Sequence, residues 1–144
     1  MLSYQQLDLI ADSYTPLLAA IWLSSALWPL RQGRWPTAAR NLASGLVAAA
    51  IVYGLMFVDL WLALWPRWAL DYSTHSALAI ALVVQLWWLL PRQRWLWLTS
   101  LLAYAGLMRY QGYHSWGDMV TTCLVVAPLL LIYRPTTRAG ETMH

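Results

Sequence analysis

Five long apolar runs, separated by short polar segments, dominate the sequence. Each run has roughly 16–25 residues, which brackets the ~20 residues that a helix needs to cross ~30 Å of hydrocarbon. We therefore predict an all-α, polytopic membrane bundle of about five transmembrane helices. The expected spans are 14–30, 41–65, 73–90, 95–110 and 116–133, followed by a polar and mobile tail over 134–144.

Local signals refine these limits. Thr15-Pro16 predicts an N-cap followed by proline in the first turn of the first span, with residues 2–13 as a short interfacial helix or frayed lead-in. In the second span, the pairs Gly45 and Ala49, and Ala50 and Gly54, have the spacing of close helix contacts. Two residues inside later spans depart from the apolar helical pattern, one because it is polar and one because it is proline. We expect Gln85 to hydrogen-bond to another helix, and Pro128 to bend the last span without ending it.

Composition supports a membrane protein of one domain, 1–144. Of 144 residues, 60% are hydrophobic and 10% are charged, which is too apolar for an ordinary soluble domain. The formal charge is +3, but no run of basic residues follows a polar helix face, so nucleic acid is not an expected partner. Cys123 is the single cysteine and has no partner for an intrachain disulfide, and the N-terminus lacks the positive region of a cleaved signal peptide.

The arginines predict the orientation. With five spans, one side receives seven arginines and the other receives Arg67 and Arg109. Because positive residues favour the cytoplasmic side, we expect the N-terminus outside and the C-terminus in the cytoplasm of a bacterial inner (plasma) membrane. The seven arginines of the cytoplasmic side are Arg31, Arg34, Arg40, Arg92, Arg94, Arg134 and Arg138.

Ionisable residues gather at the outer ends of spans two to five. Such residues are costly in or beside a bilayer and therefore indicate a functional site facing the periplasm or outside. His114 and Asp118 are four residues apart, so on a helix they would share one face, where the carboxylate can orient the imidazole. An interfacial loop with an aspartate that favours the helix dipole explains the same pair without chemistry. The gathered residues are Asp59, Arg67, Asp71, Ser73, His75, Arg109, His114 and Asp118.

Two of these segments resemble motifs of the type 2 phosphatidic acid phosphatase superfamily of membrane lipid phosphatases. The family's Pro-Ser-Gly-His motif is similar to Tyr72-Ser73-Thr74-His75, and its Ser-Arg-x5-His-x3-Asp motif is similar to the segment that ends in His114-Ser115-Trp116-Gly117-Asp118. The family's arginine corresponds to Met108, with Arg109 one residue later. Its first motif, Lys-x6-Arg-Pro, has no counterpart, because Asp59 lies where the lysine belongs.

The resemblance implies a metal-free hydrolase that cleaves a lipid or polyprenyl phosphate monoester or diphosphate. His114 would attack phosphorus and form a phosphohistidine, with Asp118 orienting its ring. His75 would protonate the leaving oxygen and then activate water. The remaining expected contacts are with substrate. They are Arg109, Arg67 and the backbone amides around Ser73 and Thr74 at a helix N-terminus.

Two other functions fit the same residues. Asp71-x3-His75 and His114-x3-Asp118, together with Asp59, form a plausible ligand set for Zn or another divalent ion. Alternatively, the outer polar face recognises a headgroup or an oligomeric partner, and the protein is a non-catalytic membrane subunit or a lipid-binding protein. The residues alone leave both alternatives open.

Overall fold

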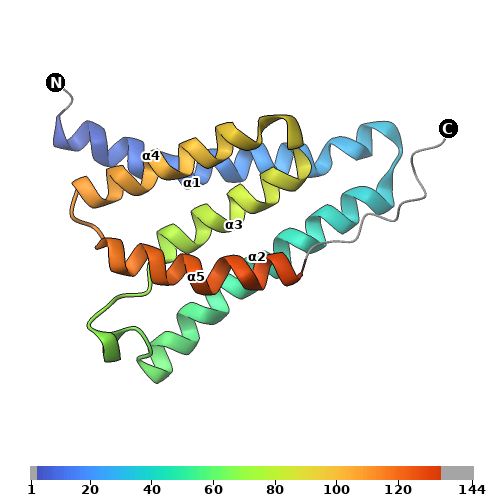
Figure 1. Ribbon diagram of the computed structural model, residues 1–144. Coiled ribbons are helices and arrows are strands. Elements are labelled where there is room, and N and C mark those ends of the chain that lie inside the picture. Colours follow the sequence, from blue (N-terminus) through green and yellow to red (C-terminus); the bar gives the residue numbers. More distant parts are fainter. Residues whose placement is uncertain (1–2, 134–144) are drawn as a thin grey trace.

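The computed structural model describes residues 3–133, and within them the chain forms five α-helices and three short 3₁₀ helices (Figure 1). The predicted all-α bundle is therefore confirmed, whereas the prediction for the tail 134–144 concerns residues outside the described range. The α-helices are α1 (Tyr4–Leu27), α2 (Trp35–Leu62), α3 (Thr74–Leu89), α4 (Arg94–Tyr110) and α5 (Trp116–Ile132), and the 3₁₀ helices are η1 (Trp28–Gln32), η2 (Pro66–Trp68) and η3 (Pro91–Gln93).

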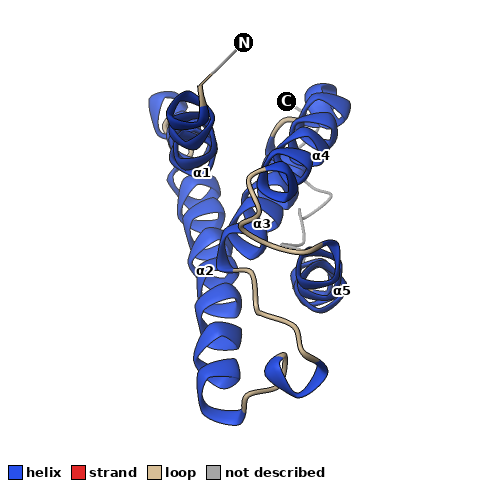
Figure 2. Cartoon of the chain, turned by 90° about the vertical axis from the view of Figure 1, so that its left-hand side faces the viewer, coloured by secondary structure: helices blue, strands red, loops and turns tan. Residues whose placement is uncertain are grey.

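Helix α3 is the centre of the bundle. It packs against α1, α2, α4 and α5 (Figure 2). Its small side chains at Ala77, Ala79 and Ala81 are buried, which lets neighbouring backbones approach closely. Larger apolar side chains such as Ile80 and Leu86 fill the remaining space in the core. Because α3 packs against four other helices, the side chains at its start are held in fixed positions.

Successive helices run in opposite directions, so the bundle has two distinct ends (Figure 1). We call the end formed by the start of α1, the α2–α3 loop and the α4–α5 loop the histidine end. The other end, formed by η1, the start of α2 and η3, is the arginine end. Every residue singled out by the sequence as a candidate for chemistry lies at or near the histidine end.

Helix α1 begins ten residues earlier than predicted, and the N-cap expected at Thr15 is wrong. Ser3 is the N-cap: its Oγ accepts from the amide of Gln6 at 3.3 Å, and its own amide donates to Gln6 Oε1 at 2.8 Å. This reciprocal pair satisfies two amides that a helix start leaves without partners. Pro16 lies inside the helix with its side chain exposed, and its ring removes one backbone hydrogen bond without ending the helix.

Helix α2 also begins earlier than expected, at Trp35 with Pro36 in its first turn. Gly45 makes the predicted close contact, because the ring of Trp22 from α1 occupies the space where a Cβ would lie. Gly54 makes no such contact, since nothing lies within 4 Å of its Cβ position. Of the two glycines predicted to make close helix contacts, only Gly45 does so.

The predicted hydrogen bond of Gln85 to another helix is confirmed, as is the prediction that Pro128 does not end the last helix, whereas the bend expected at Pro128 stays a prediction. The buried side chain of Gln85 binds Ser44 on α2: Gln85 Nε2 donates to Ser44 Oγ at 3.0 Å, and Ser44 Oγ donates to Gln85 Oε1 at 3.1 Å. Pro128 lies inside α5, which continues to Ile132.

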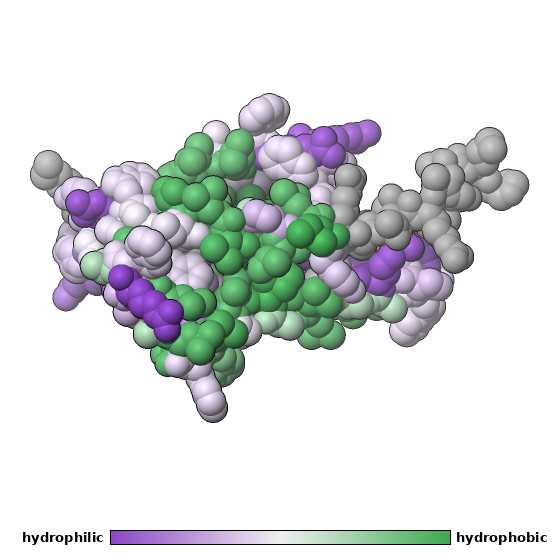
Figure 3. All heavy atoms as spheres, turned by 60° about the horizontal axis from the view of Figure 1, so that its bottom comes forward, coloured by the Kyte–Doolittle hydropathy of each residue, from purple (hydrophilic) through white to green (hydrophobic). Residues whose placement is uncertain are grey.

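By length and composition, one helix of residues 3–133 can cross a membrane, namely α2, with α3 and α5 as shorter apolar helices. The face drawn in Figure 3 is apolar around the middle of the molecule and more polar toward its two ends. Large exposed apolar side chains on different helices contribute to the apolar surface. Examples are Leu46, Phe57, Leu102, Leu124 and Leu131. The five-span topology stays a prediction.

The contact at Gly45 predicts opposite effects for two glycine-to-alanine changes in α2. Gly45→Ala forces the Trp22 ring to move and should destabilise the protein by about 1–3 kcal/mol, as overpacking does. Gly54→Ala meets open space and should stabilise it by about 0.5–1 kcal/mol, because alanine loses less backbone entropy in a helix. Thermal unfolding in one detergent compares the two, and equal effects would contradict the packing.

Candidate functional site

Two histidines from distant parts of the sequence meet at the histidine end. His75 is the second residue of α3, and His114 lies in the loop between α4 and α5. Their ring centroids are 6.5 Å apart, with the planes inclined at 48°. The His75 side chain is exposed and that of His114 is partly buried. The structure thus brings together the two imidazoles that the sequence assigns to catalysis.

Ser73 is the N-cap of α3, and its side chain is fully buried. Its Oγ accepts from the amide of Ser76 at 3.2 Å and donates to Ser76 Oγ at 2.8 Å. Its amide donates to Thr122 Oγ1 on α5 at 3.2 Å. The expectation that the Ser73 amide binds phosphate is therefore wrong, because that amide is already bonded and inaccessible. The amides of Thr74 and His75, in the first turn of α3, have no helical acceptor and are the ones that α3 can offer to an anion.

Asp118 joins the segment that precedes α3 to the N-cap of α5. Its buried carboxylate accepts from the amide of Asp71 through Oδ1 at 2.9 Å and from the amide of Ser115 through Oδ2 at 2.7 Å. Ser115 in turn caps α5, since its Oγ accepts from the amide of Asp118 at 3.1 Å. One side chain thus fixes the approach to α3 against the start of α5.

This arrangement corrects the role expected for Asp118. His114 precedes the N-cap of α5, so the pair does not share a helix face as the spacing suggested. Both oxygens of the carboxylate are bonded to backbone amides, and neither is bonded to the imidazole. Asp118 holds the loops around His114, rather than orienting its ring through a hydrogen bond.

Burial sets the protonation of His114. Partial burial lowers the pKa of His114 below its ordinary value of 6.5; Asp118 and Asp71 oppose this by raising the pKa, and His75 reinforces it. The net effect is a lowered pKa, so the imidazole is neutral at pH 7. A neutral imidazole has the lone pair that a nucleophile or a base requires.

A second carboxylate holds the His114 loop from the opposite side. Asp8 on α1 accepts at Oδ1 from Gln111 Nε2 at 2.7 Å and from the hydroxyl of Tyr113 at 2.8 Å, and the hydrogen bond to Asp8 is the main reason that the pKa of Tyr113 is raised to about 12. The Tyr4 hydroxyl also donates to the carbonyl of Gln111, at 3.2 Å. Sequence reasoning gave residues 1–13 no part in the site, since these partners are more than 100 residues away along the chain.

The two predicted cationic groups lie at the same end but are not held against the histidines. Arg109 is in the last turn of α4 and Arg67 is in η2, and both side chains are exposed. Asp59 has a structural role, because its Oδ1 accepts from the amide of Trp65 at 2.9 Å and closes the turn after α2.

The proposed metal ligands do not assemble. Within residues 3–133, no three histidine, cysteine or acidic side chains form a group that could hold a metal ion. Two of the expected ligands, Asp59 and Asp118, use their carboxylates to bind backbone amides. The ligand set of Asp59, Asp71, His75, His114 and Asp118 is therefore not supported by the geometry.

An apolar cavity of about 640 Å³ lies at the histidine end, between α2, the η2 loop and α5. Trp65 forms part of its wall: its Nε1 donates to Thr121 Oγ1 at 3.0 Å, and its ring meets that of Tyr72 edge-on, with the centroids 5.0 Å apart. Leu55, Leu64, Trp68, Leu70 and Val125 complete the lining.

Comparison with known proteins finds no matching family model, no similar curated protein and no similar solved structure. The resemblance to the phosphatase superfamily therefore rests on the two motifs alone.

The bonds of Asp118 predict how two aspartates differ. Asp118→Asn places an amide donor against one of two backbone donors, so it should destabilise the protein by about 1–3 kcal/mol. It should also speed amide exchange at residues 71 and 115. Asp71→Asn alters an exposed side chain and should change stability by less than about 0.5 kcal/mol. Hydrogen exchange and thermal unfolding measure both, and unchanged exchange in Asp118→Asn would refute the role given to this carboxylate.

The environment of His114 predicts its titration. In an NMR titration of the chain's three histidines, the midpoint of His114 should lie below 6.5, because burial disfavours the cation. In His75→Gln the midpoint should rise, since a neighbour that lowers the pKa is removed. A midpoint above 6.5 in the wild type would contradict the burial of the ring.

Proposed function

We propose that the protein is a membrane-bound, phosphatase-like hydrolase that cleaves a lipid or polyprenyl phosphate monoester or diphosphate through a phosphohistidine on His114. The observation that carries this proposal is the approach of His75 and His114 to 6.5 Å between ring centroids. A near-attack complex needs about 3–3.5 Å between reacting atoms, and two rings at this separation can reach one phosphoryl group, with His114 at phosphorus and His75 at the leaving oxygen.

The reaction divides between the two rings. The neutral His114 attacks phosphorus with its lone pair, a P–N bond forms, and the P–O bond to the lipid breaks. Protonated His75 gives its proton to the departing oxygen. In the second step, His75 takes a proton from water as the water attacks phosphorus, and the P–N bond breaks to release inorganic phosphate and neutral His114. The two side chains thus return to their starting states.

Charge on the phosphoryl oxygens needs fixed positive partners, since this stabilisation is usually the largest catalytic effect. The first-turn amides of Thr74 and His75 supply two donors at the positive end of α3. Arg109 and Arg67 extend from the same end on long, exposed side chains. On substrate binding, we expect Arg109 to move toward the phosphate, because it lies in the helical turn that leads into the His114 loop.

A lipid substrate is supported by the surface around the site. The apolar cavity lined by Trp65 and Trp68 opens at the same end and offers room for hydrocarbon beside the polar loops. The apolar middle of the molecule also suits a bilayer (Figure 3). Helices α3, α4 and α5 have 16–17 residues, or roughly 24–26 Å at ~1.5 Å per residue, which a locally thinned membrane accommodates.

We propose the orientation from the same features. Arg31, Arg34, Arg40, Arg92 and Arg94 lie at the arginine end, against Arg67 and Arg109 at the histidine end. This bias directs the arginine end to the cytoplasm and the histidine end to the outer face of a bacterial inner membrane. The N-terminus then lies outside.

Release of inorganic phosphate from a panel of lipid phosphates by the purified protein, with and without chelator, tests the function. We expect release that chelator does not affect. His114→Ala should abolish it, whereas His75→Ala should retain slow phosphoryl transfer from an aryl phosphate, whose leaving group needs no proton.

Other results would replace the proposal. Release that requires a divalent ion would favour a metalloenzyme, and equal rates in wild type and His114→Ala would remove the nucleophile. No release from any lipid phosphate, in protein that binds lipid, would indicate a non-catalytic lipid-binding protein or subunit.

A further inference from the structure

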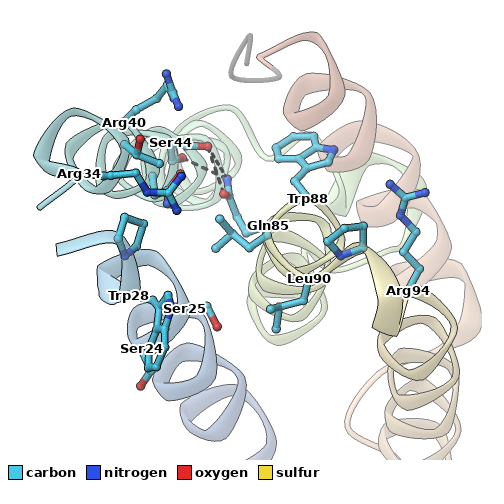
Figure 4. Close-up of a pocket in the computed structure, with 15 residues that line it drawn as sticks. Ser24, Ser25, Trp28, Arg34, Arg40, Ser44, Gln85, Trp88, Leu90 and Arg94 are labelled. Carbon is cyan, nitrogen blue, oxygen red and sulfur yellow. Dashed lines mark hydrogen bonds between the residues drawn. The ribbon is translucent and has the colours of Figure 1, made fainter. Parts of the chain in front are cut away.

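A second cavity, also of about 640 Å³, opens at the arginine end, opposite the histidines (Figure 4). This volume is within the range of about 300–1,000 Å³ that is usual for ligand pockets. Arginines line two of its walls: Arg34 and Arg40 come from the start of α2, and Arg94 comes from the start of α4. Arg94 is also held in place over the ring of Trp87, 5.4 Å from its centroid.

The base of this cavity is polar and fixed. Ser44 and Gln85 are both buried, and three hydrogen bonds of 3.0–3.2 Å join them across α2 and α3 (Figure 4). Asn41 adds a donor to the carbonyl of Ala26 on α1, at 3.4 Å. These hydrogen bonds connect α1, α2 and α3 at the base of the cavity, so the cavity lies within the packed bundle.

The charge around the cavity is one-sided. All five aspartates of residues 3–133 lie toward the histidine end, so this part of the chain supplies no carboxylate to the arginine pocket. The start of α2 at Trp35 adds the positive end of a 28-residue helix. A bound anion would offset this excess of positive charge. The planar guanidinium groups match the oxygens of phosphate, which they can bind in pairs.

Apolar side chains make up most of the remaining lining, together with Ser24, Ser25 and Thr37. Trp28 and Pro29 lie on the α1 side, and Trp88, Leu89 and Leu90 lie on the α3 side. A small hydrophilic anion would make no apolar contact with these side chains, whereas the first part of an acyl chain would pack against them. Basic pockets between helices on the cytoplasmic side are a known way to hold anionic headgroups.

We propose that this cavity binds the phosphate group of an anionic lipid, with the acyl chains against the tryptophans and leucines. The site is independent of the catalytic proposal, because it shares no residue with the histidine end and involves no bond cleavage. Arg34 points toward the cavity and holds the phosphate directly, and we expect Arg40 and Arg94, whose guanidinium groups point away from it, to turn toward the bound phosphate (Figure 4). A lipid bound there would link α1, α2 and α4 and stabilise the bundle.

Calorimetric titration in a neutral detergent tests the proposal with short-chain phosphatidylglycerol, a phosphodiester that a phosphomonoesterase does not consume. We expect saturable binding that is much tighter than that of phosphatidylcholine with the same chains or of inorganic phosphate. The double variant Arg34→Gln/Arg40→Gln should lose affinity roughly tenfold or more, since hydrogen bonds between charged groups are lost. Arg31→Gln/Arg92→Gln removes the same charge outside the cavity lining and should stay within about twofold of wild type.

Each contrary result has a definite meaning. Equal losses in the two double variants would show general attraction to a positive surface and overturn the site. Equal binding of inorganic phosphate and phosphatidylglycerol would overturn the lipid assignment, and absence of saturable binding would overturn both. Arg94→Gln, on a different helix, should weaken binding as well, so that a folding defect in the α2 variant cannot decide the outcome.

Discussion

The buried carboxylate of Asp118 is the constraint on which the histidine end depends. A buried carboxylate is stable only when its oxygens are bonded, and here each one takes a backbone amide. One amide belongs to the segment that leads into α3 and the other to the N-cap of α5, so the carboxylate between them sets how the start of α3, with His75, approaches the loop that contains His114. Asp8 holds the His114 loop from α1 in the same manner. The meeting of His75 and His114 thus follows from two carboxylates that make no contact with substrate in the proposed reaction.

The division of charge between the two ends unites the site, the proposed orientation and the second cavity. Carboxylates hold loops at the histidine end, where they also raise the pKa of His114 against the effect of burial. The arginine end has no carboxylate from residues 3–133, and Arg34, Arg40 and Arg94 are among the residues that line its cavity. In a membrane, this polarity would place a hydrolytic site outside and an anion-binding site on the cytoplasmic side. The histidine end would then hydrolyse a lipid phosphate, and the arginine end would bind one without cleaving it.

The sequence predicted best the helices that have sharp polar boundaries. The limits of α3, α4 and α5 agree to within one residue, because Ser73, Pro91 and Ser115 interrupt apolar runs at points where caps or turns are favoured. The starts of α1 and α2 were missed because residues 3–13 and 35–40 are mixed in polarity, and the capping at Ser3 outweighs the proline signal at Pro16.

The site was predictable in its histidines and not in what holds them. His75 and His114 stand out because ionisable residues are rare in this chain, and the motif spacing singles them out. The partners of Asp118 and Asp8 include backbone amides and residues more than 100 positions away, which no local pattern reveals. A four-residue spacing suggested a shared helix face for His114 and Asp118, but the N-cap at Ser115 falls between them.

Trapping of the phosphoenzyme tests the central claim most directly. Purified protein is mixed with a radiolabelled lipid phosphate, quenched in alkali within milliseconds to seconds, and digested so that the labelled peptide can be sequenced. The account predicts an acid-labile, alkali-stable phosphohistidine on the peptide that contains His114, accumulating in His75→Ala because hydrolysis of the intermediate is slowed. Phosphate release in the wild type with no label on protein, or label on any residue other than His114, would contradict it.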